Sequence, residues 1–314
     1  MTNNKIEDLL SRGTRLISEK KYDEAESIFM DLMNLDSSTA TPFVNIGMIK
    51  LLKGETDQAI DFFKRALESD PRSLEAYQNL GSSYLYKDDF ENSESMYIKA
   101  LQIDPSNYNT YHNLASLYIK SQQWSKAKKP LEKILQIDEN NYQSSFHLAM
   151  FYLSSKEYYP AIANFLYTLN IKPDYHTARL GLSDAFYKIG RYKSALTQLN
   201  IVIENLPDFI TPYIKSSLIY IEINEKEKAI PLLEKAISYE DANLEIMEIL
   251  SVLYEEQGNI EQAEELYQKI LIKDPENRSA LESLERLKIL AEKLGKNILP
   301  SVWFLLNHCK LFVF

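Results

Sequence analysis

Small side chains recur along this chain at one interval of 34 residues. The series is alanine except at its third member: Ala25, Ala59, Ser93, Ala127, Ala161, Ala195, Ala229 and Ala263. A fixed interval of this length indicates that the chain repeats one supersecondary structure. With the recurring alanine placed twentieth in each repeat, eight consecutive repeats fill residues 6–277 without an insertion.

Each repeat carries two helical patterns of apolar and polar positions. Places 4, 7, 8 and 11 have the three-to-four spacing of one helix face, and places 20, 24 and 27 show it again. Proline at place 32 ends the second pattern in five repeats, because it disfavours helix at the preceding residue. We therefore predict one helical hairpin per repeat. After a lead at 1–5, the repeats are 6–39, 40–73, 74–107, 108–141, 142–175, 176–209, 210–243 and 244–277.

Side-chain size follows the same interval. Place 8 is always small: Gly13, Gly47, Gly81, Ala115, Ala149, Ser183, Ser217 and Ser251. Place 24 is always large: Phe29, Phe63, Tyr97, Leu131, Phe165, Leu199, Leu233 and Tyr267. Small residues let two helices approach closely, and the large ones fill the space beside the contact. The aromatic residues at place 11 are likewise predicted to pack rather than to stack on nucleic-acid bases.

Some residues depart from this pattern. Pro130 and Pro231 fall inside the expected second helices of repeats 4 and 7, where proline costs about 3 kcal/mol, so these helices start late or kink. Ser145 and Arg179 replace the large residue at place 4 and predict weak packing in repeats 5 and 6. We expect repeats 4 to 6 to be the softest part of the array.

The segments after the last repeat differ from the array. Residues 278–294 predict a capping helix, with Leu281, Leu284 and Leu287 on one stripe. Residues 295–314 are apolar, with few charges. A tail folded back onto the cap or into a groove is the favoured interpretation of 298–314, and a remnant of a missing domain stays open. A membrane anchor is disfavoured, because polar residues interrupt a run shorter than the roughly 20 residues that a spanning helix needs.

Two segments show which known family the repeat resembles. They are AYQNLGSSYLYKDDFENSESMYIKALQIDP (76–105) and EILSVLYEEQGNIEQAEELYQKILIKDP (248–275). Their ladder of small and aromatic residues resembles the tetratricopeptide repeat (TPR), over residues 6–277. The resemblance implies an all-α, right-handed superhelical solenoid of eight helix hairpins plus the capping helix. It also implies that the first helices line a concave groove.

Composition restricts the environment and the partners. The 314 residues carry a formal net charge of -10, which argues against binding nucleic acid or anionic membrane over the whole surface. Cys309 is the only cysteine, so an intramolecular disulfide and a cysteine metal cluster are excluded. The N-terminus lacks the apolar core of a secretory signal. We predict a cytoplasmic protein.

The resemblance places candidate binding residues at places 6 and 9, facing the groove. Place 6 holds Asn45, Asn79, Asn113 and then His147, and place 9 of the same repeats holds Met48, Ser82, Ser116 and Met150. An asparagine amide both donates to and accepts from the backbone of an extended peptide. The alternative is that these asparagines bond to their own local backbone. We expect a peptide-binding groove in repeats 2 to 5.

The charged residues at the predicted groove positions say less about the partner than the asparagines do. No three consecutive repeats carry the lysines and asparagines of the carboxylate clamp that the family uses for acidic peptide ends. Lys188 and Lys215 make a candidate for a smaller anionic contact. Four glutamates of repeat 8 offer a face for a basic segment, although acidic surfaces are ordinary on this chain: Glu245, Glu248, Glu255 and Glu256.

No catalytic constellation is found. The chain lacks a phosphate-binding loop, a dinucleotide fingerprint, a zinc protease motif and a nucleophile elbow. His112 and His147 without a thiol or carboxylate make a poor metal site, so no cofactor or metal is expected. We predict a non-enzymatic scaffold for a protein or peptide partner. The alternative is the repeat region of a glycosyltransferase or sulfotransferase whose catalytic domain is not in this sequence.

Overall fold

The computed structural model describes residues 2–35, 39–238 and 243–293. Within these ranges the protein forms seventeen α-helices and no strand, which confirms the predicted all-α solenoid. The chain divides into two compact bodies, residues 1–155 and 156–314. None of the described helices is long and apolar enough to cross a membrane.

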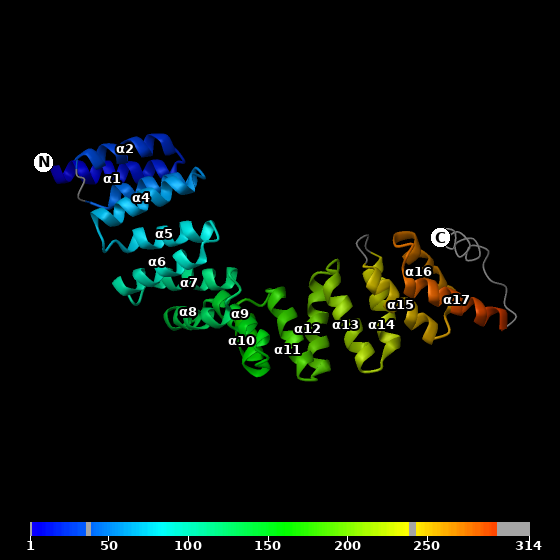
Figure 1. Ribbon diagram of the computed structural model, residues 1–314. Coiled ribbons are helices and arrows are strands. Elements are labelled where there is room, and N and C mark those ends of the chain that lie inside the picture. Colours follow the sequence, from blue (N-terminus) through cyan, green and yellow to red (C-terminus); the bar gives the residue numbers. More distant parts are fainter. Residues whose placement is uncertain (1, 36–38, 239–242, 294–314) are drawn as a thin grey trace. The chain divides into compact units, whose positions relative to one another are not determined.

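The first body is a stack of helical hairpins (Figure 1). Its helices are α1 (Thr2–Ser18), α2 (Tyr22–Leu35), α3 (Thr41–Leu52), α4 (Thr56–Ser69), α5 (Leu74–Tyr86), α6 (Phe90–Ile103), α7 (Tyr108–Lys120), α8 (Trp124–Ile137) and α9 (Tyr142–Ser154). Paired helices such as α5 and α6 pack together, and each second helix also packs on the next first helix.

The second body continues the same alternation (Figure 1). Its helices are α10 (Tyr158–Ile171), α11 (His176–Lys188), α12 (Tyr192–Asn205), α13 (Ile210–Glu222), α14 (Lys226–Ile237), α15 (Leu244–Glu256), α16 (Ile260–Lys273) and α17 (Arg278–Lys293). The last of these packs on α16, and its Leu284 and Leu287 are buried in a core shared with α13 to α16. The segment 294–314, on which the predicted anchor or tail falls, lies outside the described residues.

The turn inside each hairpin depends on one backbone conformation. All eight described residues with a positive φ lie at place 15 of a repeat, with φ between 58° and 81°. Three of them are glycine, which adopts this left-handed conformation without steric cost. The other five are Lys20, Asp88, Gln122, Lys156 and Asn224. The backbone therefore turns at the same place whether or not a glycine is present.

The predicted packing of places 20 and 24 is confirmed. Every residue of the small series at place 20 has 0% exposure. The large residues at place 24 are buried to at least 99%. In three repeats the ring at place 24 lies directly on the glycine at place 8, and a β-carbon on Gly13, Gly47 or Gly81 would lie only 2.5 to 2.6 Å from it. Glycine at place 8 thus makes room for an aromatic ring on the second helix.

The structure describes the helices with internal proline and the residue Arg179 at place 4. The helices α8 and α14 begin at place 17, as the other second helices do, so Pro130 and Pro231 do not delay them. At Arg179 the structure shows a hydrogen bond that the pattern did not predict. Its Nη2 donates to the Pro173 carbonyl oxygen at 2.8 Å, as the hydroxyls of Tyr111 and Tyr213 do to the equivalent prolines. A long polar donor therefore replaces the tyrosine at place 4.

Candidate functional site

The first helices of repeats 2 to 4 lie next to one another. α5 contacts both α3 and α7 directly, in addition to the contacts that each makes with its own second helix. Asn45, Asn79 and Asn113 occupy place 6 on these three helices, and each is half-buried. The structure therefore carries the three predicted asparagines on successive neighbouring helices of one compact body.

The three asparagines differ in their hydrogen bonds. Asn45 Nδ2 donates to the Thr41 carbonyl oxygen in its own helix at 2.9 Å, so here the alternative of local backbone bonding is observed. Among the described residues, no hydrogen bond involves the side-chain amide of Asn79 or Asn113. These two amides keep both donors and an acceptor for another molecule.

The residues at place 9 differ in how far their side chains are available to a ligand. Ser82 Oγ donates to the Gln78 carbonyl oxygen at 3.0 Å and lies 3.0 Å from the Tyr97 hydroxyl, so its hydrogen bonds stay inside the hairpin. Met48 packs against the core around Phe63. Ser116 and Met150 are half-buried. Of the place 9 positions, Ser116 thus offers the hydroxyl that intramolecular contacts leave available.

His147, at place 6 of α9, lies in an environment that disfavours its charged form. Its imidazole is half-buried and meets the Phe146 ring edge to face, with centroids 5.3 Å apart. Burial lowers the pKa of His147 below its ordinary value, and the nearby His112 lowers it further. Within the described residues, no three histidine, cysteine or carboxylate side chains group as metal ligands.

The predicted anionic contact at Lys188 and Lys215 is weakened by internal pairing. Both residues belong to the second body. Lys215 Nζ lies 2.6 Å from Asp184 Oδ1, and the Lys188 ammonium lies 5.6 Å from the centre of the Tyr187 ring. The charge of Lys215 is therefore largely neutralised within the protein.

The acidic residues of α15 are also mostly engaged. Glu255 accepts a hydrogen bond from Arg286 at 2.7 Å, Glu256 from Lys226 at 2.6 Å, and Glu248 from Asn277 at 2.8 Å. Glu245 is exposed at the first turn of the helix. The face expected for a basic segment thus presents far less free charge than its four glutamates suggest.

The sequence reasoning missed two exposed apolar side chains beside the asparagines. Leu52 of α3 is 52% exposed and Tyr86 of α5 is 74% exposed. Both occupy place 13, one turn beyond place 9, where Lys120 stands on α7. The 34-residue interval contained this signal, because place 13 falls on the same helix face as places 6 and 9. An exposed tyrosine is a common anchor for a protein partner.

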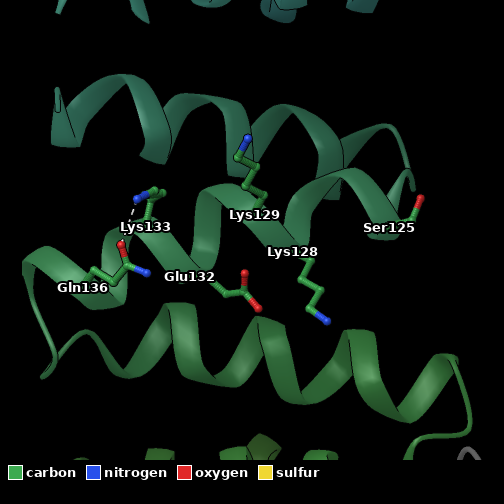
Figure 2. Close-up of a pocket in the computed structure, with 6 residues that line it drawn as sticks. All are labelled: Ser125, Lys128, Lys129, Glu132, Lys133 and Gln136. Carbon is green, nitrogen blue, oxygen red and sulfur yellow. Dashed lines mark hydrogen bonds between the residues drawn. The ribbon is translucent and has the colours of Figure 1, made fainter. Parts of the chain in front are cut away.

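A surface hollow of about 400 Å³ also escaped prediction. It is lined by six residues of one second helix, α8: Ser125, Lys128, Lys129, Glu132, Lys133 and Gln136. Figure 2 shows Lys129 pointing away from Lys128 and Glu132, and Lys133 bonding to Gln136 at 2.9 Å. Lys128 Nζ lies 5.0 Å from the centre of the Tyr152 ring. Because its lysines diverge or have partners within the protein, the hollow does not converge on a common anion.

A stack of helical hairpins with one repeat length defines a helical repeat protein, whose exposed faces bind rather than catalyse in most known cases. Three models described as tetratricopeptide repeat match the sequence. One covers residues 40–73, 74–107 and 210–243, and the others cover 96–129 and 227–287. The chain belongs to the tetratricopeptide repeat family. Among curated proteins, none matches its sequence.

Solved structures of other TPR proteins have a similar fold. YrrB, a TPR protein with an unusual peptide-binding site, is 20% identical with a TM-score of 0.54, over 63% of this chain and 97% of its own. A TPR protein from Parabacteroides merdae is 20% identical, with a TM-score of 0.51 over 79% of this chain and 98% of its own. Pseudomonas aeruginosa pilF is 16% identical, with a TM-score of 0.55 over 72% of this chain and 99% of its own. At these identities the likeness establishes the fold.

Proposed function

We propose that this chain is a non-enzymatic scaffold that binds an extended segment of another protein along α3, α5 and α7. The observation that carries the proposal is the pair of half-buried amides of Asn79 and Asn113. They occupy the same place on directly adjacent helices and have no hydrogen-bond partner among the described residues. A half-buried amide that lacks a partner gains stability when a ligand supplies one.

The spacing of the helices suits an extended chain. Packed helices lie about 8–10 Å apart, and an extended peptide rises about 3.3 Å per residue. One asparagine therefore meets every third peptide residue, where its amide bonds to the peptide N–H and C=O groups in a way that does not depend on side-chain sequence. Sequence preference comes from the neighbouring side chains Leu52 and Tyr86, which offer exposed apolar surface. The peptide-binding site of YrrB, on a similar fold, supports this choice of ligand.

Selection from a random peptide display library against the full chain tests the proposal. We expect enriched peptides to carry a large apolar residue, and we expect the N79A/N113A variant to bind them at least about tenfold more weakly, as the loss of one to two hydrogen bonds predicts. Asn45→Ala is expected to have a smaller effect, because Asn45 already bonds to Thr41.

The matched control is Gln102→Ala, which removes an exposed amide from the second helix α6 of the same body. Its affinity for the selected peptides should equal that of the natural chain. Equal binding by N79A/N113A, or an equal loss in the control, contradicts the proposal.

A further inference from the structure

Two apolar side chains are exposed at place 9 of the last two first helices. Leu218 of α13 is 44% exposed and Val252 of α15 is 43% exposed. Ile249, at place 6 of α15, is half-buried and packs against the hairpin core. Place 9 of repeats 2 to 4 instead holds Met48, Ser82 and Ser116. Place 9 is therefore exposed and apolar in both of these repeats, and we name Leu218 and Val252 the apolar strip.

The hairpin core does not account for the strip. Ser217 and Ser251, one residue before Leu218 and Val252, point inward with 0% exposure, and Leu250 is equally buried. Since adjacent helix positions diverge by about 100°, the strip faces away from that core. Its exposed area is removed from water only when another chain segment covers it.

The charges around the strip specify what covers it. Glu222 of α13 and Glu245 of α15 are exposed, and among the described residues neither carboxylate has a hydrogen-bond or ion-pair partner. The nearest lysine on these helices, Lys215, is paired with Asp184. An occupant with large apolar side chains and only positive charges therefore fits this surface.

The segment that follows α17 has this composition. Residues 295–314 include the run Val302–Leu306, with Trp303 and Phe304, and contain no aspartate or glutamate. Their two charged side chains are lysines, of which Lys310 lies within 298–314, in a chain of net charge -10. We propose that residues 298–314 dock on the apolar strip of their own chain. The proposal does not depend on peptide binding by α3, α5 and α7.

Chain geometry and charge favour docking within one molecule. The segment follows directly on α17, which shares a core with α13 and α15. Twenty extended residues span up to about 66 Å, more than enough to return along helices of this length. A tethered segment acts at an effective concentration of order millimolar. Two copies with a net charge of -10 repel each other, so the tethered segment binds ahead of a second copy.

The single cysteine of the chain provides a direct test, because Cys309 lies inside the proposed occupant. Leu218→Cys and Val252→Cys each add one partner thiol on the strip of the full chain. Under mild oxidation at low protein concentration, we expect an intramolecular disulfide with Cys309 to form at least tenfold faster than in Asn200→Cys. Asn200 is an exposed residue of α12 in the same body and serves as the control.

Equal rates in all three variants, or no disulfide in the strip variants, overturn the proposal. A covalent dimer in place of the intramolecular product also overturns it and assigns the strip to a second copy. Non-reducing electrophoresis separates these products, and mass spectrometry of the digested monomer locates the disulfide.

Fluorescence gives an independent readout without a crosslink. In a Trp124→Phe background, Trp303 is the only tryptophan of the full chain. We expect its emission to shift to longer wavelength in the L218K/V252K variant, because the indole loses its apolar contact. Leu166→Lys, at an equally exposed leucine of α10, should leave the emission unchanged. An unchanged emission in L218K/V252K, or an equal shift in the control, contradicts docking on the strip.

Discussion

Gly81 and Tyr97 are matched in size across the hairpin of α5 and α6. A β-carbon on Gly81 would lie 2.6 Å from Cε1 of the Tyr97 ring, which is itself 0% exposed. The tyrosine hydroxyl is also held, 3.0 Å from Ser82 Oγ. A ring that is fully buried and tethered at its hydroxyl cannot move aside without disturbing the second helix.

Gly81→Ala is therefore expected to destabilise the first body. Overpacking of this kind costs about 1–3 kcal/mol and should lower the urea midpoint followed by circular dichroism. Adding Tyr97→Leu should return part of the loss, because leucine occupies place 24 in repeats with alanine or serine at place 8, such as Leu131 with Ala115. A double variant no more stable than Gly81→Ala alone would show that the ring is not the cause.

Replacing a strained turn residue should stabilise the protein. Gln122 has a φ of 59°, which glycine adopts without the clash that a β-carbon brings. Gln122→Gly is expected to raise the free energy of unfolding by about 0.5–1 kcal/mol. This is the backbone strain that glycine relieves in the folded state, reduced by the greater conformational entropy that glycine gives the unfolded chain. The reciprocal change Gly190→Ala, at a φ of 73°, should lower the free energy of unfolding. Urea midpoints measure both, and shifts of the same sign would refute the explanation.

Glu26 is expected to make stability depend on acid pH. Burial acts to raise its pKa, but hydrogen bonds from Lys50 and Lys53, both at 2.8 Å, outweigh burial and hold the pKa below 4.5. The stabilisation is complete above the unfolded pKa and is lost as pH falls through the folded one. Glu26→Gln should cost about 2 kcal/mol at pH 7 and progressively less in acid.

The control for this pH dependence is Glu68→Gln, an exposed glutamate of α4. Its unfolding free energy should follow that of the natural chain at every pH. A Glu26→Gln deficit that stays constant down to pH 3 would indicate a packing defect instead of a lost ion pair.

His147 should titrate below its ordinary pKa of 6.5, first because of burial and second because of His112. A depressed folded pKa means that the unfolded chain binds the proton more readily, so stability falls as pH drops below about 6.5. Histidine NMR titration measures the pKa directly. His112→Asn should raise the pKa of His147 part of the way back, and no movement would exclude the charge of His112 as a cause.

Pro231 lies at the sixth residue of α14 and is exposed. Pro231→Ala restores a backbone donor to the helix interior, where proline costs up to about 3 kcal/mol, and should raise the melting temperature. Pro130 of α8 is buried, so Pro130→Ala also loses packing and should gain less. If both substitutions lower the melting temperature, the prolines fit these helices better than the general cost implies.

The 34-residue interval predicted the helices and their buried positions because packing repeats with the chain. Ala59 and Phe63 are buried for the reason that the pattern gives. The interval places Arg179 where other repeats have tyrosine, but it does not show that the two side chains make the same hydrogen bond. Only the geometry shows that the Arg179 guanidinium reaches the Pro173 carbonyl oxygen. Pro130 and Pro231 lie inside helices that begin at the same place as the other second helices, so the late start that helix propensity allowed is not observed.

The sequence predicted which residues lie at the candidate site, but not which of them already have partners inside the protein. Asn45, Asn79 and Asn113 share one place in sequence, yet only contacts in space show that Asn45 is bonded to Thr41. In the same way, Lys215 looks like a free cation until Asp184 is placed beside it. Charge and amide patterns name the residues on a face, whereas their partners, 4 residues away for Asn45 and 31 residues away for Lys215, decide which of them remain free for a ligand.

The ring of Phe165 adds a consequence for how this array changes in evolution and design. It lies on Gly181, with a hypothetical β-carbon 2.3 Å from its Cζ, and so it is matched by a residue of the following repeat. Phe29, Phe63 and Tyr97 each meet the glycine of their own hairpin. In the first three hairpins the glycine and its ring thus stay together when a single hairpin is duplicated or grafted, and what each hairpin shares with the next is the apolar core between them. The α10 and α11 helices must be inherited or grafted together, because either one alone brings a misfit to its new neighbour.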